Sequence, residues 1–143
     1  MKNTQTNIWI HAIWSTRDSA PLMKDVFRTQ IKAHLRYKLE ETGCRVRIIN
    51  GTADHVHALF QLGQKASLER VMDHVKSESS RWINQQKFLN MPFAWQVGYL
   101  GISVSASMLW RVEKYIRNQQ NYHKQRAYSE ELNQFVEKLK AAG

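Results

Sequence analysis

The segment NGTADHVHALFQL, residues 50–62, alternates between apolar and other side chains from His55 onward. Because successive side chains of a β-strand point to opposite faces, this alternation predicts a strand with one apolar face, made by Val56, Ala58, Phe60 and Leu62. The opposite face is predicted to be the more polar one and carries His55, His57, Leu59 and Gln61. Asn50-Gly51 is a turn signal, which predicts a connection to a preceding strand, with the next strand starting there or a few residues later. The segment therefore predicts a strand with two histidines on its more polar face, which are either a metal site or ordinary polar residues on a half-exposed strand.

Three upstream segments have clear periodicity of their own. Residues 7–16 are rich in β-branched and aromatic residues on both faces, which predicts a central strand that is covered on both sides. Residues 22–42 have apolar side chains at helical spacing, and Gly43 follows where a helix favours a left-handed residue. Residues 44–49 alternate again, which predicts a second strand. The upstream order is therefore strand, helix, strand.

Two downstream segments complete the pattern. Ser67 can cap a helix whose apolar stripe runs over residues 68–83. Residues 93–105 then form an extended segment interrupted by glycines. The resulting order β-α-β-β-α-β predicts an α+β, ferredoxin-like sandwich with an antiparallel sheet.

Two additional helices are predicted at the C-terminal end. The third helix of the chain is expected to start at Ser105 or Ser107 and to run to about Tyr122. The fourth is expected over about residues 129–141, capped by Ser129 and amphipathic through Leu132, Phe135, Val136 and Leu139. Since neither a repeat nor a linker divides the 143 residues, we expect a single domain over 1–143 with a core at about 7–125.

The charge balance indicates a polyanionic partner. Lysine and arginine number 21 against 12 acidic residues, for a formal net charge of +9. Residues 111–126 contribute five basic side chains and only one acid, Glu113. Small basic proteins commonly bind nucleic acid, although an excess of this size can also serve solubility alone.

Cysteine content and hydropathy favour a cytoplasmic protein. Cys44 is the only cysteine, which excludes an internal disulfide and a multi-cysteine zinc site and fits a reducing compartment. The chain has no run of about 18 apolar residues and no recognisable secretory signal at its start. We therefore expect a cytoplasmic localisation and no membrane partner.

The two histidines have two possible roles. Strand geometry puts His55 and His57 about 6.5 Å apart on one face, which is close enough to share a metal ion. A pair at this spacing also arises by chance, so the spacing alone does not separate a metal site from a polar strand face. The decision depends on a third ligand and on a reactive group.

The third predicted helix offers both kinds of group. Tyr115 and Gln119 are four residues apart and share a helical face, as do Gln119 and His123. Tyr122 lies seven residues beyond Tyr115 on nearly the same stripe and is a rival nucleophile. A purely structural role for Tyr115, packed beside Val112 and Ile116, is equally compatible with the helical pattern.

Four segments in sequence order are similar to one known family. They are DHVH (54–57), VKSESSRWIN (75–84), WQVGYLGISVS (95–105) and YIRNQ (115–119). With them, the chain resembles the single-tyrosine HUH transposases of bacterial insertion sequences, also called TnpA-like transposases, over roughly residues 7–125. The resemblance implies a ferredoxin-like fold, a homodimer, a divalent metal, and cleavage and rejoining of single-stranded DNA at the hairpin-bearing ends of a mobile element.

Site roles follow from the resemblance residue by residue. It implies that His55 and His57 are metal ligands, that Tyr115 is the nucleophile, and that Gln119 is the third ligand. It also implies that the tyrosine helix of one subunit serves the histidine pair of the other. Tyr122 and His123 rank below Tyr115 and Gln119 on this ground. Ala53 stands where relatives often have proline, which affects the turn and leaves the chemistry unchanged.

The implied chemistry suits these residue types. Two neutral imidazoles and an amide oxygen favour Mg²⁺ or Mn²⁺ over a closed structural zinc site. Attack by tyrosine on a phosphodiester would leave a 5′-phosphotyrosine and a free 3′ hydroxyl, and its reversal would rejoin DNA without ATP. His11 and Asp54 are candidates to orient the metal ligands, with a purely structural role as the alternative for His11.

Contacts to DNA are expected from basic side chains. The candidates for phosphate contacts are Arg45, Arg47, Lys76, Arg81, Arg111, Lys114 and Arg117. An exposed tryptophan among the five in the chain could stack on an unpaired base, and we assign none. Two alternatives remain open: a domesticated relative acting on chromosomal repeats, and a non-catalytic nucleic-acid-binding module of the same fold.

Overall fold

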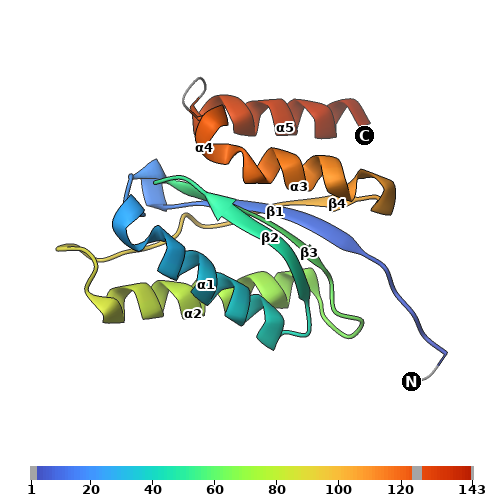
Figure 1. Ribbon diagram of the computed structural model, residues 1–143, viewed down its shortest axis with the longest axis horizontal. Coiled ribbons are helices and arrows are strands. Elements are labelled where there is room, and N and C mark those ends of the chain that lie inside the picture. Colours follow the sequence, from blue (N-terminus) through green and yellow to red (C-terminus); the bar gives the residue numbers. More distant parts are fainter. Residues whose placement is uncertain (1–2, 124–126, 143) are drawn as a thin grey trace.

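The computed structural model describes residues 3–123 and 127–142. Its centre is a four-stranded antiparallel sheet with the strand order β2-β3-β1-β4. The strands are β1 (Trp9–Ser15), β2 (Arg45–Gly51), β3 (His55–Gln61) and β4 (Leu100–Val104). With the helices between them, they form the predicted α+β, ferredoxin-like arrangement (Figure 1).

Two long helices cover one face of the sheet (Figure 1). They are α1 (Asp25–Glu41) and α2 (Leu68–Gln86), and their buried side chains join one core with the apolar face of β3. Gly43, with a φ of 88°, ends the first of these helices as predicted. Ser67 caps the second by accepting a hydrogen bond from the backbone N–H of Arg70. Since α1 and α2 bury one side of the sheet, functional groups on β3 have to face the other side.

The opposite face is covered by the C-terminal helices, α3 (Leu109–Arg117), α4 (Gln119–Tyr122) and α5 (Tyr128–Ala142) (Figure 1). Short 3₁₀ helices, η1 (Arg17–Ser19) and η2 (Ala106–Met108), follow β1 and β4. Leu59 from β3 packs there with Leu109 and Ile116 in a second, smaller core. The alternative of a half-exposed polar strand is therefore excluded, because β3 is buried on both faces and His55 and His57 are fully buried.

Three predicted boundaries differ from the structure. β2 continues through Asn50 and Gly51, so the turn to β3 lies at residues 52–54. The predicted third helix is divided at Asn118, where the backbone leaves the helical conformation (φ −94°, ψ 18°). The fourth helix begins at Tyr128, which places Ser129 inside the first turn instead of at the cap.

Candidate active site

The Nδ1 atom of each β3 histidine contacts a neighbouring side chain. The Nδ1 of His55 lies 2.8 Å from a carboxylate oxygen of Asp54. The Nδ1 of His57 lies 2.8 Å from Nε2 of His11, which sits on the neighbouring strand β1. Such contacts orient an imidazole ring and leave its Nε2 free for another partner. The two residues expected to orient the histidines, His11 and Asp54, both contact them.

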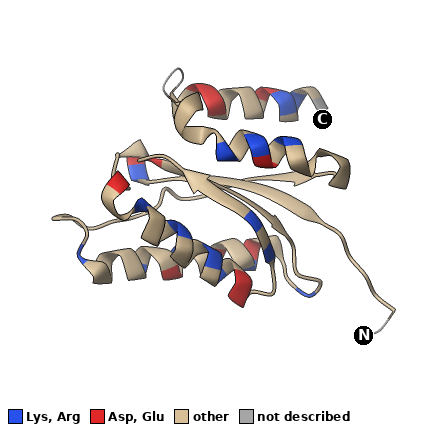
Figure 2. Ribbon diagram, in the orientation of Figure 1, with Lys and Arg blue, Asp and Glu red and all other residues tan. Residues whose placement is uncertain are grey.

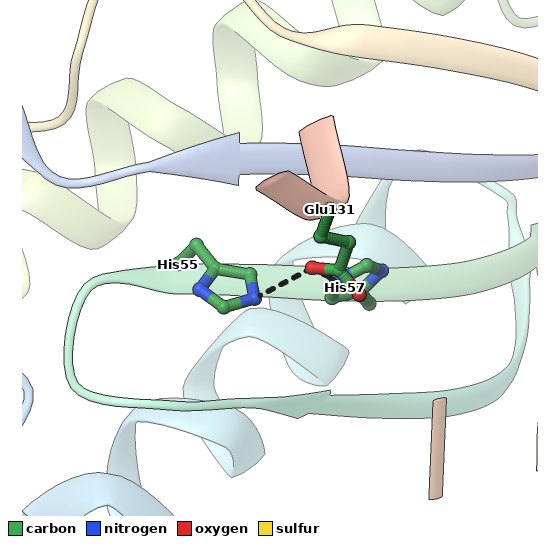
Figure 3. Close-up of side chains that lie close together, drawn as sticks. All are labelled: His55, His57 and Glu131. Atoms are coloured by element: carbon green, nitrogen blue, oxygen red, sulfur yellow. Dashed lines mark hydrogen bonds and ion pairs between the residues drawn. The ribbon is translucent and has the colours of Figure 1, made fainter. Parts of the chain in front are cut away.

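The Nε2 atoms of the two rings meet one carboxylate from α5 (Figure 3). An oxygen of Glu131 lies 3.2 Å from Nε2 of His55 and 3.0 Å from Nε2 of His57. The amide oxygen of Gln119, at the start of α4, lies 3.1 Å from Nε2 of His55, and its amide nitrogen donates to the second oxygen of Glu131 at 3.0 Å. Through these contacts His55, His57, Gln119 and Glu131 form one polar cluster, which we call the histidine centre.

His123, a rival ligand on sequence grounds, also contacts this cluster. Its Nε2 lies 3.0 Å from the same oxygen of Glu131, and its ring is 4.5 Å from that of His55. On another side, the ring of Tyr128 stacks on His55 at 4.2 Å. The first turn of α5 and the end of α4 therefore close the histidine centre over the sheet.

The pKa values of the two histidines are shifted in opposite directions. Burial disfavours a charged ring at both, but the carboxylates of Asp54 and Glu131 on either side of His55 outweigh it and raise the pKa of that ring. At His57 burial prevails over the attraction of Glu131 and lowers the pKa. The Glu131 carboxyl is penalised by its own burial, yet hydrogen bonds from both histidines lower its pKa, so it is the anion of the centre.

The histidine centre fits a divalent cation. His55, His57 and Glu131 each offer a ligand atom, and these atoms lie within 4.8 Å of one another. Neighbouring ligands of an octahedral ion bound at about 2.1 Å lie about 3 Å apart. The separations of Nε2 of His55 from the oxygens of Glu131 and Gln119, 3.2 and 3.1 Å, and of Nε2 of His57 from the oxygen of Glu131, 3.0 Å, are compatible with this spacing. Two imidazole nitrogens with carboxylate and amide oxygens are a mixed N/O donor set that a divalent cation can bind.

Tyr115 lies beside the histidine centre in the same chain. Its half-buried ring is 5.7 Å from the ring of His57 and 6.4 Å from that of His11. Phe135 of α5 contacts it edge-on at 5.9 Å. The rival Tyr122 has its ring 5.5 Å from that of Tyr115 and donates its hydroxyl to Gln134 at 3.1 Å.

The break between α3 and α4 is held by buried Asn50. Its amide donates to the backbone carbonyls of Ile116 and Arg117 at 2.9 and 3.1 Å, and it exchanges hydrogen bonds with the side chain of Gln120. These carbonyls lie in the last turn of α3, where regular intrahelical partners run out. Asn50 of β2 therefore fixes the point at which Gln119 enters the histidine centre.

The predicted DNA-contacting residues do not gather on one surface. Arg111, Lys114 and Arg117 lie on α3, with Arg47 nearby through an ion pair to Glu113. Figure 2 shows both basic and acidic residues on α3. Glu113 also pairs with Arg117, so it neutralises part of this group.

The remaining candidates lie elsewhere. Lys76 and Arg81 are on α2, across the sheet, where Lys76 donates to two carbonyls of the 96–98 loop and Arg81 pairs with Glu78. Burial lowers the pKa of Lys76. Arg45 is exposed on the edge strand β2.

Glu131 is the residue of the centre that sequence reasoning missed. It is only 1% exposed, although carboxylates are rarely buried without partners. In the sequence it precedes Phe135 by four residues and so shares a side of the helix with an apolar residue. An acidic residue on the apolar side of a helix could have indicated a buried carboxylate, but the sequence does not show which residues it contacts.

The comparisons with known proteins assign the family. The family model described as "Transposase IS200 like" matches residues 4–119. The match covers more than half of the chain, so this protein belongs to the IS200-like transposases, which supports a transposase function. A comparison with curated proteins found no significant match.

Two solved structures share the fold. A candidate transposase from Deinococcus radiodurans R1 is 21% identical, with a TM-score of 0.68 over 83% of this chain and 95% of the other. A REP-associated tyrosine transposase, solved bound to a REP hairpin, is 10% identical, with a TM-score of 0.63 over 86% of this chain and 74% of the other. At these identities the likeness concerns the fold.

The helices give no indication of a membrane span. Within residues 3–123 and 127–142, none has the length and apolar character needed to cross a bilayer.

Proposed function

We propose that this transposase is a metal-dependent enzyme that cleaves and rejoins single-stranded DNA through a covalent 5′-phosphotyrosine on Tyr115. The observation that carries the proposal is the position of Tyr115, 5.7 Å ring to ring from His57, beside a buried cluster with the donor set of a cation site. Membership of the IS200-like transposases supports it independently. We also propose that residues 1–143 act as one domain.

The proposed reaction is an in-line displacement at phosphorus. The oxygen of Tyr115 would form a bond to the scissile phosphate while the bond to the 3′ oxygen breaks. The phenolic proton leaves, and the departing 3′ oxygen gains a proton to become a free hydroxyl. Attack of another 3′ hydroxyl on the phosphotyrosine would reverse these changes and rejoin DNA.

The cation site would be made by His55, His57 and Glu131, with Gln119 as a further oxygen ligand. When bound there, Mg²⁺ or Mn²⁺ would supply Lewis-acid polarisation of the scissile phosphate. Asp54 and His11 would keep the two imidazoles oriented through their Nδ1 atoms.

The proposed substrate is single-stranded DNA with hairpins at the ends of a mobile element. The net charge of +9 supports a nucleic-acid partner. A relative of the same fold was solved with a REP hairpin, which supports hairpin recognition. A domesticated enzyme acting on chromosomal repeats would use the same chemistry, whereas a binding module would bind without cleavage.

A labelled-DNA assay tests the proposal. The protein is incubated with Mn²⁺ or Mg²⁺ and single-stranded element ends labelled on either side of the cleavage point. We expect a denaturation-resistant protein–DNA adduct that carries the label 3′ of the break, together with a released strand ending in a 3′ hydroxyl. Binding without an adduct under either metal would instead establish the binding module.

The assembly of the active site is a separate prediction. The family resemblance implies a homodimer with shared sites, whereas this chain has Tyr115 beside its own His57. If each site is built within one chain, a mixture of His57→Ala and Tyr115→Phe subunits should form no adduct beyond the sum of the two variants alone. Recovery of adduct after mixing, in the same assay, would establish shared sites.

A further inference from the structure

An open groove of about 620 Å³ runs along α3 and α4 next to the proposed nucleophile. It is lined by Trp110, Arg111, Lys114, Tyr115, Asn118 and Tyr122. A second hollow of about 200 Å³ lies between α3 and α5, and Arg111 and Tyr115 line both. Tyr115 is therefore reached from an open surface, although the histidine centre behind it is buried.

Trp110 is the conspicuous aromatic side chain of the groove. It is 58% exposed, and the guanidinium of Arg111 lies 5.1 Å from the centre of its ring. An exposed tryptophan has apolar surface in contact with water, and a nucleobase can cover that surface by stacking. Trp110 precedes Tyr115 by five residues, which is about 7.5 Å along a helix axis.

The charges of the groove are positive. Within the part of the chain that the structure describes, neither Arg111 nor Lys114 has an ion-pair partner, because Glu113 is engaged by Arg47 and Arg117. Arg111 and Lys114 thus flank the path from Trp110 to Tyr115 with uncompensated cations. Asn118 adds an amide, which can donate to a phosphate or a base.

From this arrangement we propose that the groove binds the unpaired DNA strand next to the scissile phosphate. One base stacks on Trp110, and the adjoining phosphates contact Arg111 and Lys114. This inference rests on the proposed function for its substrate and adds the place where the single strand lies. The combination of an aromatic platform with cations is the one used for single strands without sequence preference.

The test is equilibrium binding without cleavage. The parent protein carries Tyr115→Phe, the buffer contains EDTA, and the probe is a fluorescent twelve-nucleotide oligo-dT measured by anisotropy. Trp110→Ala should weaken binding by about tenfold, as expected for one lost base–aromatic stack. Trp110→Phe should retain most of the affinity. Lys114→Gln should lower the slope of log K against log salt by about 0.7.

The matched control is the aromatic–cation pair of α1, on the other side of the sheet. Tyr37 is 60% exposed and has the ammonium of Lys38 5.4 Å from its ring centre. Tyr37→Ala should leave the affinity within twofold of the parent. An unchanged affinity in Trp110→Ala, an equal loss in Tyr37→Ala, or no binding by the parent would each overturn the proposal.

A second measurement addresses the other possible occupant, a second copy of this chain. If sedimentation velocity shows that Trp110→Ala dissociates a dimer while oligo-dT binding is unchanged, the groove is a subunit interface and the proposal is wrong. The binding and cleavage experiments can fail independently. If binding depends on Trp110 but the unmutated protein forms no adduct, the proposal for the groove stands and the proposed cleavage chemistry is wrong.

Discussion

Tyr115→Phe is expected to abolish the covalent protein–DNA adduct, with a loss of at least about a thousandfold in the rate of cleavage. The substitution removes the hydroxyl that forms the bond to phosphorus and supplies no replacement. It keeps the ring that packs against His57, His11 and Phe135, so the fold should be preserved. The readout is the fraction of labelled strand that remains attached to protein after denaturation.

Tyr122→Phe is the matched control for this prediction. Its ring is 5.5 Å from that of Tyr115, but its hydroxyl is engaged by Gln134. We expect adduct formation within a few-fold of the unmutated protein. Loss of the adduct in Tyr122→Phe, with its retention in Tyr115→Phe, would transfer the nucleophile to Tyr122.

Removal of a ligand from the histidine centre should have the second large effect. Glu131→Gln keeps the shape of the side chain but replaces an anionic oxygen with an amide, and it should weaken Mn²⁺ binding by about a hundredfold. Changes in the surroundings of metal ligands already cost about 10- to 100-fold, and a ligand should cost at least as much. His57→Ala should abolish measurable binding because it removes an imidazole nitrogen outright.

Metal binding is measured by titration calorimetry and by thermal unfolding. A cation present at a hundred times its dissociation constant stabilises the folded protein by about 2.7 kcal/mol, and this gain should disappear in His57→Ala. His74→Ala is the control, since His74 is paired with Glu41 at the surface, away from the histidine centre. Because His57→Ala also removes one of the buried partners of Glu131, Glu131→Gln is the milder comparison.

Gln119→Ala separates two possible ligand sets. If Gln119 is the third ligand, as the family resemblance implies, its loss should weaken Mn²⁺ binding while Glu131→Gln has a small effect. If Glu131 is the stronger ligand, the order is reversed, because a carboxylate binds a hard cation more tightly than a neutral amide. Equal affinities in the unmutated protein and in both variants would contradict a cation site at this position.

Much of the fold was predictable because it depends on local patterns. The alternation from His55 to Leu62 determines which side chains of β3 share a face, whatever covers that face. Gly43 and Ser67 mark helix ends through backbone conformation and a local hydrogen bond. The division of the third helix at Asn118 was not predictable in this way, because Asn50 of β2 stabilises it by donating to the carbonyl of Ile116, 66 residues further along the chain.

The sequence by itself determined that His55 and His57 lie on one strand face and that Tyr115 belongs to a basic helix. Only the tertiary structure decided what meets them. The approach of Glu131 to His57, across 74 residues, depends on how α5 packs over the sheet, and no local pattern encodes that packing. The burial of His55 and His57 has the same cause, since α4 and α5 exclude water from their face of β3. From its residue types alone, this face was expected to be polar. Exclusion of water makes each contact of the histidine centre stronger than it would be at a surface, which is the physical reason that this face suits a cation site.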